Sequence, residues 1–122
     1  MKTYAKGARA ERELLHYLNS KGFAVIRAPS SGGELSPVDI VAIKNGLIIA
    51  IESKSWENKP KLPKDRVDRL KEWSDKAGAI TFLGWRTRNK WLFLQLKNVL
   101  ENRYEDENWI GMENFLTALD FR

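Results

Sequence analysis

The feature that most constrains the fold is the dipeptide Asn45-Gly46, which separates two strongly apolar runs, 38–44 and 47–54. Asn-Gly between apolar runs is typical of a two-residue hairpin turn in which both central residues have positive φ. Such a turn fixes the partner of every residue in the two strands. Lys44 pairs with Leu47, and outward along the ladder Asp39 is expected opposite Glu52.

This register brings three charged residues together at the open end of the hairpin. Asp39 and Glu52 become direct neighbours on one face, and the alternation of side chains places Lys54 on that face as well. Two adjacent carboxylates repel each other unless a cation lies between them. Oxygen ligands without His or Cys favour Mg²⁺, with Mn²⁺ as a substitute. A structural ion-pair network at the sheet edge is the alternative explanation.

A third carboxylate comes from a predicted amphipathic helix over 8–20. Leu14, Leu15 and Leu18 form its apolar stripe, and Glu11 precedes them at helical spacing, so it lies on the same face. Glu13 lies off the stripe and is expected in solvent. Glu11 is therefore a candidate third metal ligand.

The remaining pattern predicts one α/β domain over 1–122, with a mixed sheet flanked by helices. Residues 1–7 form an arm or the lead-in to the first helix. The further elements expected are strands at 23–27, 79–85 and 91–96, loops at 28–37 and 55–64, a helix at 65–77 and a short helix at 112–119. Both faces of the hairpin are apolar, with Val38 and Ile40 on one and Val41 on the other. The hairpin therefore belongs in the middle of the sheet.

Composition limits the class of protein without naming it. An apolar fraction of 43% and a charged fraction of 30% are typical of a soluble globular domain. The absence of cysteine excludes disulfides and thiolate metal sites and favours a cytoplasmic location. The longest apolar run, 47–51, is too short to span a membrane. A net charge of +5 indicates an anionic partner.

The stretch from Pro37-Val38-Asp39 to Glu52-Ser53-Lys54 resembles the PD…(D/E)xK signature of restriction-endonuclease-like nucleases. More narrowly, K-G-A-R-A-E-R-E-L-L at 6–15, G-F-A-V-I-R-A-P-S-S-G at 22–32 and the hairpin itself are similar to the archaeal-type Holliday junction resolvases. The similarity is dense over 6–54, continues weakly to Trp85 and thins out beyond it.

The resemblance implies a metal-dependent endodeoxyribonuclease that cuts two opposed strands of a four-way DNA junction as a homodimer. Its metal ligands would be Glu11, Asp39 and Glu52, with the backbone carbonyl of Ser53, and Lys54 would position or activate the attacking water. Ser31 matches the family's active-site serine, and Ser30 is the less favoured choice. An ordinary loop or cap role for Ser31 remains open.

The resemblance also implies a DNA-binding surface, with Arg12 and Arg27 at positions that contact phosphates. The full set of residues expected to contact DNA is Lys6, Arg9, Arg12, Arg27, Ser30, Lys59 and Lys61. Further basic residues lie in the loop at 55–64, at the start of the helix that follows it and in an expected turn at 86–90. They are either phosphate contacts or solubilising charges; they are Lys64, Arg66, Arg86, Arg88 and Lys90. A non-catalytic DNA-binding module of this fold, or a nuclease with another DNA target, are the alternative functions.

Two roles remain open for Trp56, which either stacks at the junction centre or packs on a partner subunit. The other large aromatic residues are expected in the core or at a dimer interface; they are Trp85, Trp91, Phe93 and Trp109.

Overall fold

A computed structural model describes residues 2–28 and 35–119, with the backbone alone at 2–6 and 118. The elements in chain order are α1 (Lys2–Ser20), β1 (Ala24–Arg27), β2 (Ile40–Lys44), β3 (Leu47–Lys54), α2 (Lys64–Ala77), β4 (Ile80–Thr87), β5 (Lys90–Gln95), α3 (Leu96–Leu100), the 3-10 helix η1 (Asp106–Asn108), β6 (Ile110–Gly111) and α4 (Met112–Leu119). None of the helices in this described part is long and apolar enough to cross a membrane.

The strands form one six-stranded sheet in the order β1-β2-β3-β4-β5-β6. All neighbours are antiparallel except β3 and β4, which run parallel. A parallel step needs a crossover connection, and α2 supplies it. The predicted mixed sheet flanked by helices is therefore confirmed, and β3 lies inside it as expected.

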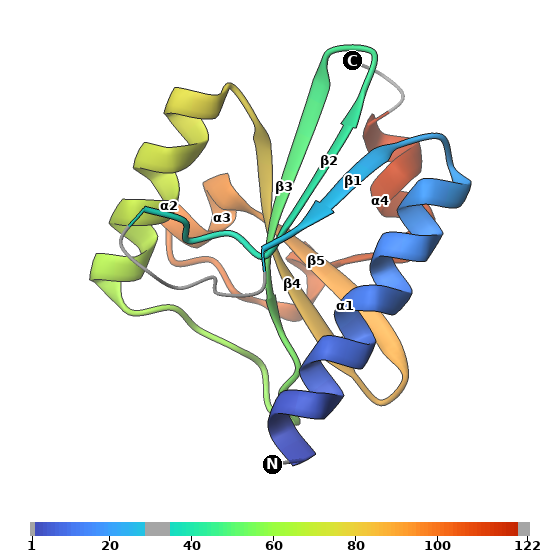
Figure 1. Cartoon of the computed structure of the whole chain (residues 1–122). Helices are drawn as coiled ribbons and strands as arrows, with labels where there is room; N and C mark the ends of the chain where they lie inside the picture. Colours follow the sequence, from blue (N-terminus) through green and yellow to red (C-terminus); the bar gives the residue numbers. More distant parts are fainter. Residues whose placement is uncertain (1, 29–34, 120–122) are drawn as a thin grey trace.

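The helices cover the sheet from both sides. Helices α1 and α4 lie on one face, and α2 and α3 lie on the other (Figure 1). Leu14 and Leu18 of α1 pack with Phe115 of α4 in the core of the first face. Leu70 of α2 and Val99 of α3 belong to the core of the second face. The sheet thus separates two apolar cores, which is why its central strands are apolar on both faces.

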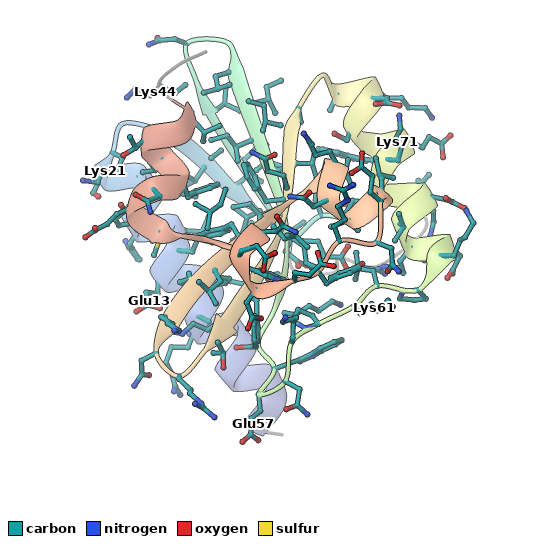
Figure 2. The ribbon with its side chains drawn as sticks, turned by 180° about the vertical axis from the view of Figure 1, so that it is seen from behind. Glu13, Lys21, Lys44, Glu57, Lys61 and Lys71 are labelled. Atoms are coloured by element: carbon teal, nitrogen blue, oxygen red, sulfur yellow. The ribbon has the colours of Figure 1, made fainter. Side chains whose placement is uncertain are left out.

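The hairpin turn is as predicted, with φ of 50° at Asn45 and 86° at Gly46. Lys44 pairs with Leu47, and the same register continues to Ile40 and Ile51. Figure 2 shows Lys44 near the tip of this hairpin and Lys21 at the neighbouring corner. The Lys44 ammonium donates to the Lys21 carbonyl at 3.1 Å, so the turn is tied to the end of α1.

The side-chain alternation expected across Asp39 is wrong. Val38 packs in the core on the α2 face, whereas Ile40 packs in the core on the α1 face. In a regular strand these two residues would share a face. The Asp39 N–H instead donates to the Ile51 carbonyl at 2.8 Å, and its own carbonyl accepts from the Ala28 N–H at 2.8 Å. The chain therefore bends at Asp39, and β2 begins one residue later.

Smaller differences concern element ends. Helix α1 begins at Lys2, so the first residues are part of the helix rather than a separate arm. Strand β4 continues to Thr87, which reduces the expected turn at 86–90 to Arg88 and Asn89. The elements α3, η1 and β6 were not predicted; each is five residues or fewer. Helix α4 has the predicted bounds.

Candidate active site

Glu11 faces the sheet, as its place on the apolar stripe predicted. Its Oε1 accepts from Arg27 Nε of β1 at 2.7 Å, and its Oε2 accepts from the Ser53 hydroxyl of β3 at 2.7 Å. Glu13, by contrast, is exposed and pairs with Arg86. Helix α1 therefore delivers one carboxylate to the end of β3 and keeps the other in solvent.

Asp39 is 7% exposed and lies in the bend before β2, where its carboxylate also contacts Ser53. Its Oδ2 accepts from the Ser53 backbone N–H at 2.6 Å and lies 3.1 Å from the Ser53 hydroxyl. The pKa of Asp39 is raised to about 6, mainly by burial; the nearby charges of Glu11 and Glu52 add to the rise, and the bond from the Ser53 N–H opposes it. Asp39 thus lies within electrostatic reach of both other carboxylates.

Glu52 is only 1% exposed, and two basic side chains contact the same one of its oxygens. Its Oε2 is paired with Arg66 of α2 and lies 3.4 Å from Lys54 Nζ. The other oxygen, Oε1, is buried and has no hydrogen-bond partner among the residues that the structure describes. A buried carboxylate oxygen without a donor is costly, which marks a position suited to a further positive group.

The three carboxylates lie on both sides of the sheet end. Ile51 belongs to the core on the α1 face, and Leu83, the partner of Glu52 in β4, belongs to the core on the α2 face. Glu52 and Lys54 therefore share the α2 face, as predicted. Asp39 does not stand beside Glu52 on that face, because the bend directs its carboxylate to Ser53. The prediction that Asp39 and Glu52 form a direct cross-strand pair is therefore wrong. Asp39 contacts Ser53, the residue next to Glu52.

The donor set suits a hard divalent cation, because it consists of carboxylate oxygens without His or Cys. Within the described ranges, however, no three acidic, His or Cys side chains are arranged to hold a metal ion as they stand. Protein groups occupy most of these oxygens: Arg27 and Ser53 on Glu11, and Arg66 and Lys54 on Glu52. The ligand roles of Glu11, Asp39 and Glu52 remain a prediction.

Lys54 also connects the site to the loop that follows β3. Its Nζ lies 5.3 Å from the centroid of the Trp56 ring, which is 44% exposed. The indole N–H of Trp85 donates to the Trp56 carbonyl at 2.8 Å and holds this loop segment in place. Trp91, Phe93 and Trp109 are buried in the core, which is one of the two places expected for them.

The residues predicted to contact DNA fall into different environments. Arg9 and Arg12 are exposed on α1, whereas Arg27 pairs with Glu11 and is engaged inside the site. Lys59 binds Asp106 and the Tyr104 carbonyl, and Lys61 lies over the Tyr104 ring. Ser30 and Ser31 lie outside the described residues, as does the side chain of Lys6.

Two contacts were missed from the sequence. Arg66 was grouped with the basic loop residues, yet its side chain is 18% exposed and pairs with a buried carboxylate. Ser53 was expected to contribute its carbonyl, yet its N–H and hydroxyl are what join Asp39 to Glu11. The only signal for Arg66 is its place in the first turn of the helix that crosses from β3 to β4.

The fold and site define a nuclease of the restriction-endonuclease-like class, with acidic residues and a lysine at the end of a central strand. A family model described as archaeal Holliday junction resolvase (Hjc) matches residues 2–121. The chain belongs to this family and is an endonuclease.

Individual relatives agree with this family. The chain is 36% identical to the crossover junction endodeoxyribonuclease Hjc of Sulfolobus acidocaldarius over 99% of its own length and 87% of the relative's. It is 32% identical to the crossover junction endodeoxyribonuclease Hje of the same organism, over 91% and 84% of the two chains. The solved Holliday junction resolvase Hjc of Archaeoglobus fulgidus matches with a TM-score of 0.62 and 33% identity, over 75% and 78% of the two chains.

Proposed function

We propose that this resolvase hydrolyses phosphodiester bonds in opposed strands of four-way DNA junctions, with Mg²⁺ held by Glu11, Asp39 and Glu52. Mn²⁺ would serve as a substitute. The observation that carries the proposal is the buried Oε1 of Glu52, which has no hydrogen-bond donor in the ranges 2–28 and 35–119. The next residue of the same strand, Ser53, binds both Asp39 and Glu11. A structural ion-pair network has no need to leave such an oxygen without a donor.

The residues of the chain have distinct roles in this reaction. A bound divalent cation supplies a more acidic water and offsets the negative charge of the transition state. Lys54 places a second positive charge at the site, where its side chain is 24% exposed and so partly dehydrated. Its ammonium orients the attacking water and attracts the phosphate. Ser53 holds the carboxylates of Glu11 and Asp39 in register, and its carbonyl is a further candidate ligand.

Recognition of the junction rests on charge and shape in this proposal. Arg9 and Arg12 on α1 supply phosphate contacts that do not depend on sequence. Lys6, Lys59, Lys61 and the serines Ser30 and Ser31 belong to the same proposed surface, with Ser31 as the active-site serine. A homodimer would supply the second site needed for two opposed cuts, and the cytoplasm is the proposed location.

The experiment compares cleavage of a labelled four-way junction with cleavage of a linear duplex of the same sequence, in Mg²⁺ and in EDTA. Asp39→Asn and Glu52→Gln should each lower junction cleavage by about a thousandfold, the equivalent of several kcal/mol of lost metal stabilisation. Junction binding should persist, because phosphate contacts remain. Glu13→Gln removes an exposed carboxylate from the same helix as Glu11 and is the matched control.

Three results would contradict parts of this proposal. Full cleavage by Asp39→Asn or Glu52→Gln would remove the assigned ligands. Equal cleavage of junction and duplex would indicate a nuclease with another target. Junction binding by the wild type without cleavage under any metal would favour a non-catalytic DNA-binding module.

A further inference from the structure

The carboxylates of the site are compensated by cations of the chain itself. Arg27 pairs with Glu11, and Arg66 and Lys54 both pair with Glu52. Glu52 needs this compensation most, because it is 1% exposed and a buried ion without a partner costs several kcal/mol. Both of these cations contact Oε2, and within the described part of the chain Oε1 has no hydrogen-bond partner.

Of these two cations, Arg66 makes the closer contact with Glu52. Lys54 Nζ lies 3.4 Å from Oε2 and also faces the exposed ring of Trp56. Arg66 donates a closer bond to the same oxygen. Its side chain is only 18% exposed, and it is carried by α2, which Leu70 anchors in the core. The guanidinium is therefore held at Glu52 by the packing of a helix.

We propose that Arg66 is the internal counter-ion of Glu52 in the metal-free enzyme and that it sets the affinity of the site for a divalent cation. The inference rests on the proposed metal role of Glu52. Arg66 and a metal ion are two positive charges that share one carboxylate. Each therefore weakens the binding of the other to Glu52, whether Arg66 remains in place or is displaced.

Arg66 weakens metal binding, but it also stabilises the buried Glu52 carboxylate when no metal is bound. Without it, the metal-free protein would hold Glu52 in an apolar setting with Lys54 as its remaining described cation partner. With it, the site folds in the absence of metal, and the cation must reach a higher concentration before it binds. Arg66 is in this sense a positioning residue, since it acts through Glu52 and not on the scissile phosphate.

The test is calorimetric titration of Mn²⁺, and separately Mg²⁺, into the full chain without DNA. Arg66→Gln should bind about tenfold more tightly than the wild type, the effect of removing one nearby like charge. Arg66→Lys retains the charge and should stay close to the wild type. Arg69→Gln removes an arginine three residues further along α2 that pairs with Asp65, and it should change nothing.

Thermal melting adds a readout that separates this role from a merely structural one. Arg66→Gln should melt at a lower temperature than the wild type in EDTA and regain more of the difference when Mn²⁺ is added. A structural arginine would lower the melting temperature without tightening metal binding. If Arg66→Gln is too unstable to purify, Arg66→Met keeps the aliphatic stem and carries the same expectation.

The outcomes distinguish the two proposals. Equal or weaker metal binding by Arg66→Gln, with Asp39→Asn binding less than the wild type, would overturn the role of Arg66 alone. Metal binding by Asp39→Asn that equals the wild type would overturn the proposed metal site itself. Tighter binding by Arg66→Gln together with weakened binding by Asp39→Asn supports both.

Discussion

The backbone N–H of Ser53 donates to Asp39 Oδ2 at 2.6 Å. This bond holds the Asp39 carboxylate at β3 even though the chain leaves the regular hairpin pattern at that residue. The Ser53 hydroxyl lies 2.7 Å from Glu11 Oε2 and 3.1 Å from Asp39 Oδ2. Because a hydroxyl has a single proton, it donates to one carboxylate at a time, and the shorter distance favours Glu11.

The buried Asp39 predicts an unusual dependence of stability on pH in the metal-free protein. Its pKa is raised from 3.8 to about 6, so folding favours the protonated form. That contribution is fully present below about pH 4 and is lost as the pH rises through 6, which amounts to about 3 kcal/mol. Asp39→Asn should therefore be more stable than the wild type at pH 8 in EDTA and lose this advantage at pH 4.

Chemical denaturation at both pH values measures this difference. Asp68→Asn, at an exposed position paired with Lys64, is the control and should show no such change with pH. An Asp39→Asn variant that is no more stable than the wild type at pH 8 would mean that the carboxylate is well compensated when ionised. If Asp39→Asn is the more stable protein at pH 8, then the ionised Asp39 carboxylate destabilises the metal-free fold. That is the expected result for a site arranged to bind a cation.

Ser53→Ala tests the hydroxyl that connects two of the carboxylates. The backbone bond to Asp39 survives this change, while Glu11 loses one of its two partners. Cleavage should fall by about ten- to a hundredfold, as for the loss of a group that orients a metal ligand. Stability should change by only about 1 kcal/mol. Ser20→Ala, which removes an exposed hydroxyl from α1, is the matched control. Unchanged cleavage would show that Arg27 alone orients Glu11.

Lys61→Ala tests the proposed contacts of the loop between β3 and α2 with DNA. Lys61 is exposed, and Figure 2 shows it beside α2 on this loop. If it contacts a phosphate, its removal should reduce the slope of log affinity against log salt by about 0.9. Lys59→Ala should have a smaller effect, because Asp106 already compensates that ammonium. Lys76→Ala, at the other end of α2, is the control, and anisotropy titrations in EDTA give all the slopes. A slope unchanged by Lys61→Ala would exclude the contact.

The sequence could predict the hairpin, its register and the orientation of Glu11, because each depends on local patterns. It could not predict the bend at Asp39, where the backbone bonds to Ala28, just after β1, and to Ile51 of β3. It also could not predict the pairing of Arg66 with Glu52. That contact arises only when the crossover helix packs onto the sheet, so no spacing along the chain encodes it. The short elements after β5 were missed because so few residues carry no measurable periodicity.

Gly84→Ala tests how tightly the strand beside the site is packed. Gly84 pairs with Ser53 across β3 and β4, and a Cβ there would lie 2.9 Å from Ile51 Cγ2 and 3.3 Å from Trp91 Cζ3. Both neighbours are buried and have little room to move, so the variant should lose about 1–3 kcal/mol of unfolding free energy. Gly111→Ala is the matched control, because a Cβ at that strand position meets nothing within 4 Å. Denaturation of both variants measures the difference.

Cleavage per folded molecule should also fall for Gly84→Ala, since a shift of β4 moves Ser53 and the carboxylates it holds. Full activity in a destabilised variant would show that the site tolerates this movement.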